Sequence, residues 1–275
     1  AGATAVQELA FTFANAKAYV SAAIHAGLSV EKFAPRLSFF FNAHNNFFEE
    51  IAKFRAARRL WATIMKEEFN AATPESMKLR FHAQTGGSTL TAQQIDTNVP
   101  RVTLQALAAV LGGCQSLHTN SFDEAIALPT EFSARIARNT QLILQHESQV
   151  TKVVDPLGGS YYVEALTHAL ATHARALIDE VEAMGGMTKA ILSGMPKLQI
   201  EASAAKRQAR LDLGQETVVG VNKYATEEEP HEILDIDASW VRDRQIKRLD
   251  SIKKSRDSNR VRGLLESLTQ AASQK

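Results

Sequence analysis

Apolar and polar positions follow two different rhythms along the chain, and each rhythm predicts a kind of element. Apolar residues recur at helical spacing in several segments that end at glycines or polar residues. The predicted helices span about 4–25, 45–69, 98–111, 131–147, 160–184 and 198–213. Short runs with strand-like alternation lie between them, at 35–42, 77–84, 115–119 and 151–154. This fourfold strand–helix order predicts a parallel α/β arrangement.

The texture of the chain changes after Gly185-Gly186. A short apolar run, VVGV (218–221), precedes a turn-rich acidic stretch at 227–230, and the tail from Ala238 is charged and helical in character. We therefore predict two domains, residues 1–186 and a mainly helical C-terminal extension, 187–275. The charged tail is typical of a solvated or partner-packed amphipathic helix. Nucleic acid is the weaker alternative, because no aromatic residues interleave with the charges.

One face of each of the first three predicted strands carries small or polar side chains, because alternate residues point to opposite faces. That face collects Arg36, Ser38, Phe40, Lys78, Arg80, His82, Gln84, Ser116, His118 and Asn120. Burying such polar groups without partners costs on the order of 2–7 kcal/mol each. An ordinary (β/α)₈ barrel is instead filled with bulky branched residues. The pattern favours a cavity for a polar ligand; an internal hydrogen-bond network or partial exposure is the alternative.

Two loops follow the carboxyl ends of these strands, where barrel enzymes place their sites. Gly86-Gly87 permits close approach of a ligand to the backbone, although a double glycine also marks ordinary turns. In the second loop, 120–124, Glu124 is suited to accept hydrogen bonds from a ribose or an amide.

Two further motifs are weak. A metal site at His82 and His118 lacks an accompanying carboxylate or cysteine cluster. Gly158-Gly159-Ser160 before a helix suits a phosphate, but an N-cap serine is the simpler interpretation.

Composition narrows the class of protein. The 275 residues carry 31 Lys and Arg against 30 Asp and Glu, which argues against a partner of nucleic acid or membrane. The single cysteine, Cys114, cannot form an internal disulfide and fits a reducing compartment. No run of 18 apolar residues and no signal peptide is visible, so we expect a cytoplasmic protein. The start at Ala1, without methionine, leads us to expect a fragment or a processed product.

Several blocks resemble one known family over essentially the whole chain. They are FAPRLSFFF (33–41), EEIAKFRAARRLWA (49–62), LRFHAQT (79–85), QSLHTNSFDEAIALPT (115–130), RIARNTQ (135–141), DPLGGSYYVEALT (155–167), EAMGGM (182–187) and VVGVNKY (218–224). The chain thereby resembles the adenosylcobalamin-dependent acyl-CoA mutases, in particular the large (alpha) subunit of the branch that interconverts methylmalonyl-CoA and succinyl-CoA.

The resemblance implies the second half of a (β/α)₈ TIM barrel that holds acyl-CoA along its axis. It implies an isomerase with a radical mechanism, in which the thioester group undergoes a 1,2-shift, and adenosylcobalamin as cofactor. An isobutyryl-CoA or related branched acyl-CoA mutase is an alternative, because Phe41, Asn42, Ala43, His44 and Ser88 depart from the commonest methylmalonyl pattern. A second alternative is a non-catalytic assembly fragment. The most remote alternative is an unrelated acid–base barrel enzyme that uses His82 and Glu124.

Carried over by position, the resemblance implies two groups of site residues. The substrate-binding group is Arg36, Ser38, Phe40 and His82, and the cofactor-binding group is Gln84, Gly87, Asn120, Glu124 and Ala127. The resemblance implies no catalytic residue in this half of the barrel and no metal ligand. The DxHxxG segment that ligates cobalt is absent from the chain, so we expect a separate cobalamin-binding domain or subunit.

The expected partners follow from the same resemblance. They are an acyl-CoA substrate, a small cobalamin-binding subunit, the N-terminal half of the barrel and a GTPase chaperone. A half barrel of four strands would expose its sheet edges and much apolar surface. We therefore expect no activity without the missing half and the cobalamin subunit.

Overall fold

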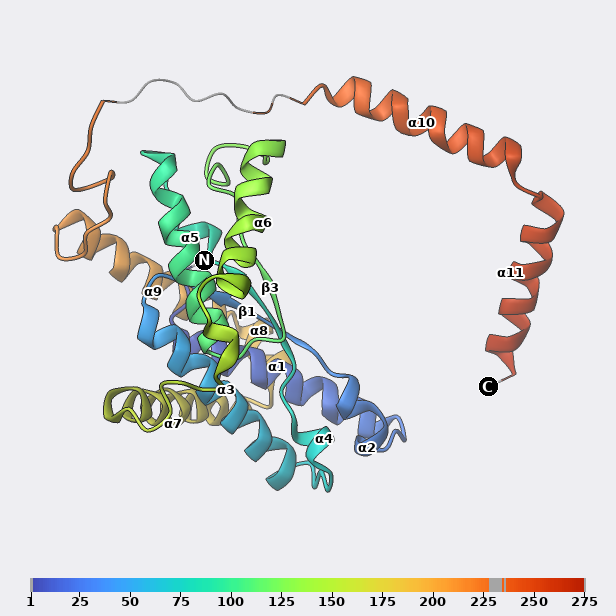
Figure 1. Ribbon diagram of the computed structural model, residues 1–275. Coiled ribbons are helices and arrows are strands. Elements are labelled where there is room, and N and C mark those ends of the chain that lie inside the picture. The colour runs from blue at the N-terminus through green and yellow to red at the C-terminus, as the bar shows by residue number, and fades with distance from the viewer. Residues whose placement is uncertain (1, 228–233, 235, 275) are drawn as a thin grey trace. The chain divides into compact units, whose positions relative to one another are not determined.

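The computed structural model describes residues 2–227, 234 and 236–274, and the chain divides into two compact units. The first, Ala1–Ile233, is a mixed α/β unit that contains a small parallel sheet (Figure 1). The second, Leu234–Lys275, is helical. None of the described helices combines the length and the apolar character needed to cross a membrane.

The sheet has three parallel strands among the described residues, in the order β1-β2-β3. These are β1 (Phe39–Ala43), β2 (Phe81–Thr85) and β3 (Ser116–His118). A helix follows each strand: α3 (Phe47–Glu67), α5 (Asn98–Leu111) and α6 (Glu131–His146). The predicted strand–helix order and the parallel sheet are thus confirmed for three of the four predicted repeats.

The predicted strand at 151–154 is wrong. Val150–Lys152 form a 3-10 helix, η4, and Val154 is 97% exposed. The turn is bracketed by Gln149 and Asp155, whose φ angles of 62° and 46° bend the chain away from extended geometry. An apolar run this short, between two left-handed residues, has no neighbouring strand to pair with.

The first two strands begin later than predicted, and a helical turn that contains a proline precedes each of them. Pro35 is the second residue of the 3-10 turn η1 (Ala34–Arg36), and Pro74 is the first residue of the short helix α4 (Pro74–Met77), because proline suits the first turn of a helix. Arg36 and Ser38 therefore precede β1 instead of lying on it. Lys78 and Arg80 likewise precede β2.

The core lies on one face of the sheet, beneath α1 (Ala5–His25), α3 and α5. Phe13 of α1 contacts Phe39 and Phe41 of β1 edge to face, with ring centroids 5.6 and 6.1 Å apart, and stacks on Trp61 of α3 at 5.6 Å. Phe81 of β2 joins them, so the face opposite the predicted polar face is apolar. The long helix α7 (Tyr161–Ala183) packs against α1 and α3 from outside.

The remaining elements are short or peripheral. The helix predicted at 198–213 is confirmed as α9 (Met195–Asp212), and Gly194, with a φ of 80°, separates it from α8 (Met187–Ser193), which was not predicted. The VVGV run forms no strand, only an isolated bridge between Val219 and Lys223. Other short helices are α2 (Val30–Phe33), η2 (Gly87–Thr89) and η3 (Ile95–Thr97).

The predicted acidic stretch at 227–230 lies outside the described residues beyond Glu227. The predicted domain boundary at residue 186 stays a prediction, while the compact units divide between Ile233 and Leu234.

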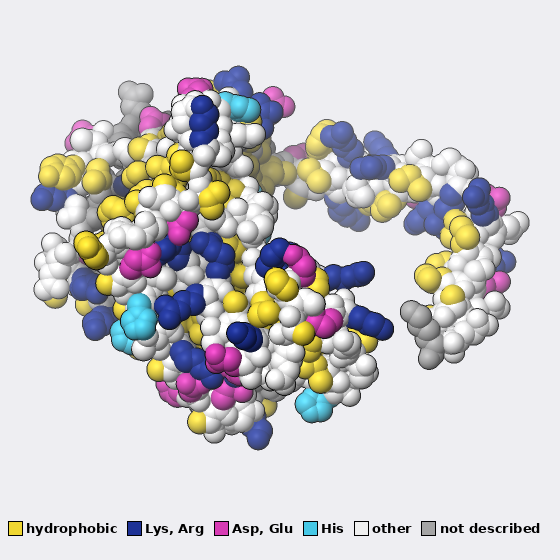
Figure 2. Space-filling view, turned by 60° about the horizontal axis from the view of Figure 1, so that its bottom comes forward, with side chains coloured by type: hydrophobic (Ala, Val, Ile, Leu, Met, Phe, Trp, Pro, Cys, Tyr) yellow, Lys and Arg dark blue, Asp and Glu magenta, His cyan; other side chains and the backbone are white. Residues whose placement is uncertain are grey.

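The second unit consists of α10 (Ala238–Ser255) and α11 (Ser258–Ser273), so the helical character predicted for the tail is confirmed. Asp237 and Asp257 cap these helices through hydrogen bonds from backbone N–H groups. Figure 2 shows basic and hydrophobic side chains intermixed on this unit. Its exposed hydrophobic side chains include Trp240, Leu249, Ile252, Leu264, Leu265 and Leu268.

Candidate ligand-binding site on the open face of the sheet

The second face of the sheet is open and carries polar side chains in register. Phe40 lies beside His82, and His82 lies beside Ser116, so these three side chains form one row across the strands. Asn42, Gln84 and His118 form the next row toward the carboxyl ends. Phe40, the second residue of β1, is 51% exposed on this face. The face therefore offers an aromatic ring and several polar side chains to solvent.

Two of the four predicted substrate-binding residues meet on this face. The Phe40 and His82 rings lie 5.6 Å apart, centroid to centroid. His82 Nδ1 is 2.7 Å from the Ser116 hydroxyl, which fixes the orientation of the imidazole. The other two, Arg36 and Ser38, are exposed at the amino-terminal approach to β1. Arg36 makes no hydrogen bond or ion pair with any described residue, so its guanidinium is available to an anion.

Four of the five predicted cofactor-binding residues come together at the carboxyl ends of β2 and β3. Gln84 Nε2 donates to Asn120 Oδ1 at 3.2 Å, and the Asn120 backbone N–H donates to Thr85 Oγ1 at 2.9 Å. A Cβ added at Gly87 would lie 2.8 Å from Asn120 Nδ2 and 3.5 Å from Glu124 Cγ. Gly87 is thus the residue that lets the two loops approach. We call Gln84, Gly87, Asn120 and Glu124 the strand-end cluster.

The fifth residue, Ala127, lies in the turn after the strand-end cluster. Its backbone N–H donates to the Asp123 carbonyl oxygen at 3.0 Å, and its side chain is half-buried. Ala127 therefore belongs to the backbone turn that follows Asp123 and closes this loop.

The loop after β3 holds polar atoms that are buried without a partner. Asn120 is only 2% exposed, yet its Nδ2 makes no hydrogen bond, and the same is true of Ser121 Oγ and Asp123 Oδ1. Leaving one such group unsatisfied costs about 1–3 kcal/mol. A polar partner at this loop would remove that cost. Sequence reasoning named Asn120 but missed Ser121 and Asp123, although the polar run directly after a strand end was a usable signal.

A buried ion cluster fixes the carboxyl end of β1, and sequence reasoning missed it. Lys53 of α3 is fully buried, and its Nζ lies 2.6 Å from Glu8 Oε2, 2.6 Å from Glu50 Oε2 and 2.7 Å from the Asn42 carbonyl oxygen. Glu8 Oε1 accepts from the Asn42 N–H at 2.7 Å. Burial alone would lower the pKa of Lys53, but the two carboxylates outweigh burial and raise it.

The same cluster determines the charge of Glu50. Burial alone would raise the pKa of Glu50, but Lys53 and His44 together hold the pKa below its usual value. Glu50 is therefore a buried carboxylate, and its Oε1 lies 3.8 Å from His44 Nδ1.

The weaker sequence alternatives gain no support from the geometry. No group of three potential metal ligands gathers anywhere in the described part of the chain. His118 pairs in register with Gln84 and not with His82. At the Gly158-Gly159-Ser160 loop, the Gly159 N–H donates to Glu164 Oε1 at 2.9 Å, so a carboxylate already takes the place a phosphate would need.

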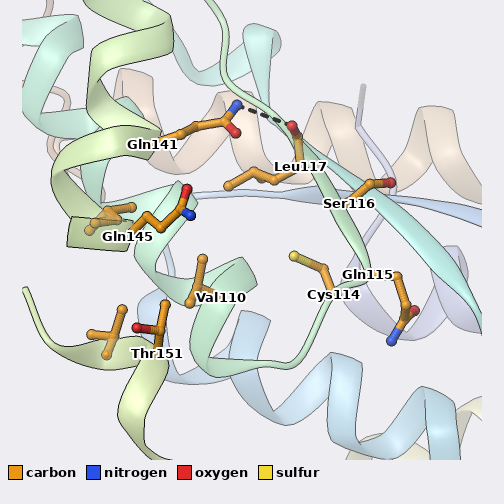
Figure 3. Close-up of a pocket in the computed structure, with 10 residues that line it drawn as sticks. Val110, Cys114, Gln115, Ser116, Leu117, Gln141, Gln145 and Thr151 are labelled. Atoms are coloured by element: carbon orange, nitrogen blue, oxygen red, sulfur yellow. Dashed lines mark hydrogen bonds between the residues drawn. The ribbon is translucent and has the colours of Figure 1, made fainter.

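A separate pocket of about 300 Å³ lies beside β3, between α5, α6 and η4 (Figure 3). Its lining includes Cys114, Leu117, Gln141 and Gln145 but no residue predicted to bind substrate or cofactor. The Gln141 side chain crosses it to donate to the Leu117 carbonyl oxygen at 3.0 Å. Burial raises the pKa of the Cys114 thiol to about 11, so this cysteine is a poor nucleophile. The pocket carries no evident chemistry.

Comparison with known proteins gives a consistent result over the whole chain. The profile of one protein family, described as methylmalonyl-CoA mutase, matches residues 1–275. The methylmalonyl-CoA mutase of Cereibacter sphaeroides is 59% identical over 275 residues, which cover 100% of this chain and 39% of that protein. That of Rhizobium meliloti is 58% identical over 273 residues, covering 99% of this chain and 38% of that protein.

A protein of Porphyromonas gingivalis named methylmalonyl-CoA mutase large subunit is 54% identical over 276 residues. The alignment covers 100% of this chain and 38% of that subunit. The chain thus spans less than two-fifths of the length of each of these three relatives.

Proposed function

The chain belongs to the methylmalonyl-CoA mutase family, and on that premise we propose that it forms part of an adenosylcobalamin-dependent acyl-CoA mutase. The reaction is the interconversion of methylmalonyl-CoA and succinyl-CoA by a 1,2-shift of the thioester group. The observation that carries the proposal is the strand-end cluster, which ends an open, polar sheet face and contains the buried, unpartnered Asn120 Nδ2.

The strand-end cluster fits the cofactor in two respects. The missing Cβ at Gly87 lets the Asn120 side chain lie against this loop, and Asn120 Nδ2 is a buried donor in need of an acceptor. Gln84, Gly87, Asn120, Glu124 and Ala127 would hold the cofactor. When bound, adenosylcobalamin supplies the radical chemistry that these side chains cannot perform. The task of the chain's own residues is to orient the bound molecules and to exclude water from them.

The acyl-CoA substrate would lie along the open face, toward the amino ends of the strands. Phe40 offers an apolar surface to the acyl chain, and His82, held by Ser116, offers a ring nitrogen to a polar group. Arg36 and Ser38, exposed where the chain enters β1, suit the phosphates of coenzyme A. No acid, base or nucleophile is assigned within this segment.

The partly exposed Phe40 and the open face support a (β/α)₈ barrel completed by an N-terminal half. One relative carries the name large subunit, which supports a small cobalamin-binding partner. A GTPase chaperone remains a proposal from family resemblance alone. The unpaired Cys114 agrees with a cytoplasmic location.

Phe41, one of the residues that depart from the methylmalonyl pattern, does not lie on the face proposed to bind the substrate. Phe41 is fully buried and points to the core face of β1, against Phe13, Phe54 and Phe81. Its identity therefore cannot select an acyl group on the open face. The position of Phe41 thus gives isobutyryl-CoA no support, and the names of the relatives favour methylmalonyl-CoA as the substrate.

The test uses the complete large subunit together with its cobalamin-binding subunit. We expect conversion of methylmalonyl-CoA to succinyl-CoA that requires adenosylcobalamin, and little turnover of isobutyryl-CoA. Turnover of isobutyryl-CoA alone would transfer the proposal to that substrate. Binding of the cobalamin subunit without turnover of either acyl-CoA would identify a non-catalytic assembly component.

A further inference from the structure

His44 has no assigned role, yet it lies at the same edge of the sheet as the strand-end cluster. It directly follows β1, and its side chain is 29% exposed. Its Nδ1 lies 3.8 Å from Glu50 Oε1, and the other oxygen of Glu50 contacts the buried Lys53 at 2.6 Å. The imidazole thus faces a fixed negative charge on one side, which favours a proton on Nδ1.

The other side of the imidazole lies on the turn that carries Gly87. A Cβ added at Gly86 would be 2.5 Å from His44 Cδ2 and 3.1 Å from His44 Nε2. Gly86 is itself fixed, because its N–H donates to the Ala43 carbonyl oxygen at 2.8 Å and to Gln105 Oε1 at 2.9 Å. His44 therefore packs directly against the residue that precedes Gly87.

The second ring nitrogen of His44, Nε2, has no hydrogen-bond partner among the described residues. His44 lines a cavity of about 510 Å³ together with Ser88 and Thr89, the two residues that follow Gly87. The starts of α1 and α3 and residues on and after α9 form the rest of its wall, and no member of the strand-end cluster lines it. When the imidazole is neutral with its proton on Nδ1, Nε2 keeps a free lone pair and can accept a hydrogen bond.

We propose that His44 is a further cofactor-binding residue, whose Nε2 accepts a hydrogen bond from an amide N–H or a hydroxyl group of the bound cofactor beside Gly87. This inference rests on the proposed function, since it places a ligand at the strand-end cluster. Glu50 and Lys53 act through His44 and are positioning residues.

The test measures the dissociation constant for adenosylcobalamin of the complete enzyme, by titration followed through the absorbance of the cofactor. His44→Leu removes the acceptor and keeps the bulk, and we expect it to weaken binding roughly 3- to 10-fold, the worth of one net hydrogen bond. His44→Gln restores an acceptor oxygen and should recover most of the affinity. The KM for acyl-CoA at saturating cofactor should stay unchanged in both variants.

His173→Leu is the matched control, since His173 is an exposed histidine on α7 and should leave cofactor binding unchanged. His44→Ala, which only removes atoms, replaces His44→Leu if the leucine variant fails to assemble. Wild-type affinity in the leucine or alanine variant would overturn the role of His44, and so would a shift confined to the KM for acyl-CoA. Equal losses in His44→Gln and His44→Leu would show a packing role instead. Failure of the wild-type enzyme to bind the cofactor would contradict the proposed function itself.

Discussion

Gly87 is the residue at which a single added carbon has the clearest consequence. Its missing Cβ would lie 2.8 Å from Asn120 Nδ2, closer than side-chain carbons approach such an atom. We expect Gly87→Ala to displace Asn120, break its hydrogen bond with Gln84, and weaken cofactor binding by the complete enzyme at least about tenfold, or ~1.4 kcal/mol.

The matched control is Gly263→Ala on α11, where an added Cβ meets nothing within 4 Å. That change should leave binding intact and raise helix stability by roughly 0.5–1 kcal/mol. Equal cofactor affinity of the Gly87→Ala enzyme and the wild type would remove Gly87 from the site.

The Arg36→Ala variant tests whether the open face of the sheet binds acyl-CoA near the start of β1. The Arg36 guanidinium is exposed and pairs with no described residue, so Arg36→Ala should leave the thermal unfolding temperature unchanged. We expect weaker acyl-CoA binding by about 1.5–3 kcal/mol, measured as a rise in KM of the complete enzyme. Arg59→Ala, at an exposed position of α3, serves as the control. An unchanged KM for Arg36→Ala would contradict the assignment.

Much at the residue scale could be predicted from strand alternation alone. Phe40, His82 and Gln84 do share a face, because period two is a local property of extended chain. The Glu8–Lys53–Glu50 cluster could not be predicted, because it joins α1, β1 and α3 through contacts 45 residues apart along the chain. Such contacts are set by packing and leave no local pattern.

At the scale of elements, helices were predicted better than strands. The helix at 98–111 was predicted with its observed ends, since Gly112-Gly113 end a clear apolar period. The first two strands begin later than predicted because helical turns that contain Pro35 and Pro74 extend into the segments predicted as strands, as far as Arg36 and Met77. The run at 151–154 failed as a strand because the left-handed angles at Gln149 and Asp155 carry no signal in those residue types.

The buried ion cluster determines how β1 and α3 are held together. Lys53→Met should leave the carboxylates of Glu8 and Glu50 without their counterion and destabilise the complete enzyme by about 3–5 kcal/mol. Chemical denaturation measures this change. Lys66→Met, at an exposed position on the same helix, is the control and should have little effect. A loss of less than about 1 kcal/mol in the free energy of unfolding would mean that the Glu8–Lys53–Glu50 cluster does little to stabilise the fold.

Glu31 joins α2 to α4 and makes their contact dependent on pH. Its carboxylate accepts from the Ser76 hydroxyl at 2.6 Å, from the Thr73 hydroxyl and from the Ala72 N–H at 2.8 Å. These hydrogen bonds, that of Ser76 first, lower the pKa of Glu31 from 4.5 to about 2. A depressed folded-state pKa stabilises the fold above the unfolded value, and this stability is lost as the pH falls through the folded value.

Thermal unfolding of Glu31→Gln against wild type checks this dependence. We expect wild type to be more stable at pH 6, and the difference to shrink as the pH falls from 4.5 toward 2. A difference that stays constant over this range would show that the charge of Glu31 is not involved.

At the scale of the whole molecule, the described sheet is open on one face and at both edges. It has three strands, and the chain spans 39% of one relative and 38% of two others. Phe40 is half exposed on the open face, and the second unit presents Trp240 and several leucines to solvent. Large exposed apolar surfaces mark interfaces in soluble proteins.

Residues 1–275 produced alone should therefore associate or bind hydrophobic dyes, whereas the complete enzyme should not. Sedimentation velocity and dye fluorescence measure both properties. A monomeric, cooperatively unfolding product of 275 residues would contradict the expectation that this segment needs the rest of a barrel.

The central claim is that the strand-end cluster holds the cofactor, and a structure of the complete enzyme with bound adenosylcobalamin tests it most directly. The quantity to measure is the distance from Asn120 Nδ2 to the nearest acceptor atom of the cofactor. We predict a hydrogen bond of about 2.7–3.2 Å, which would satisfy the donor that is buried without a partner here. A cofactor that lies away from Asn120 and Gly87, with Asn120 Nδ2 bonded to the protein instead, would contradict the claim.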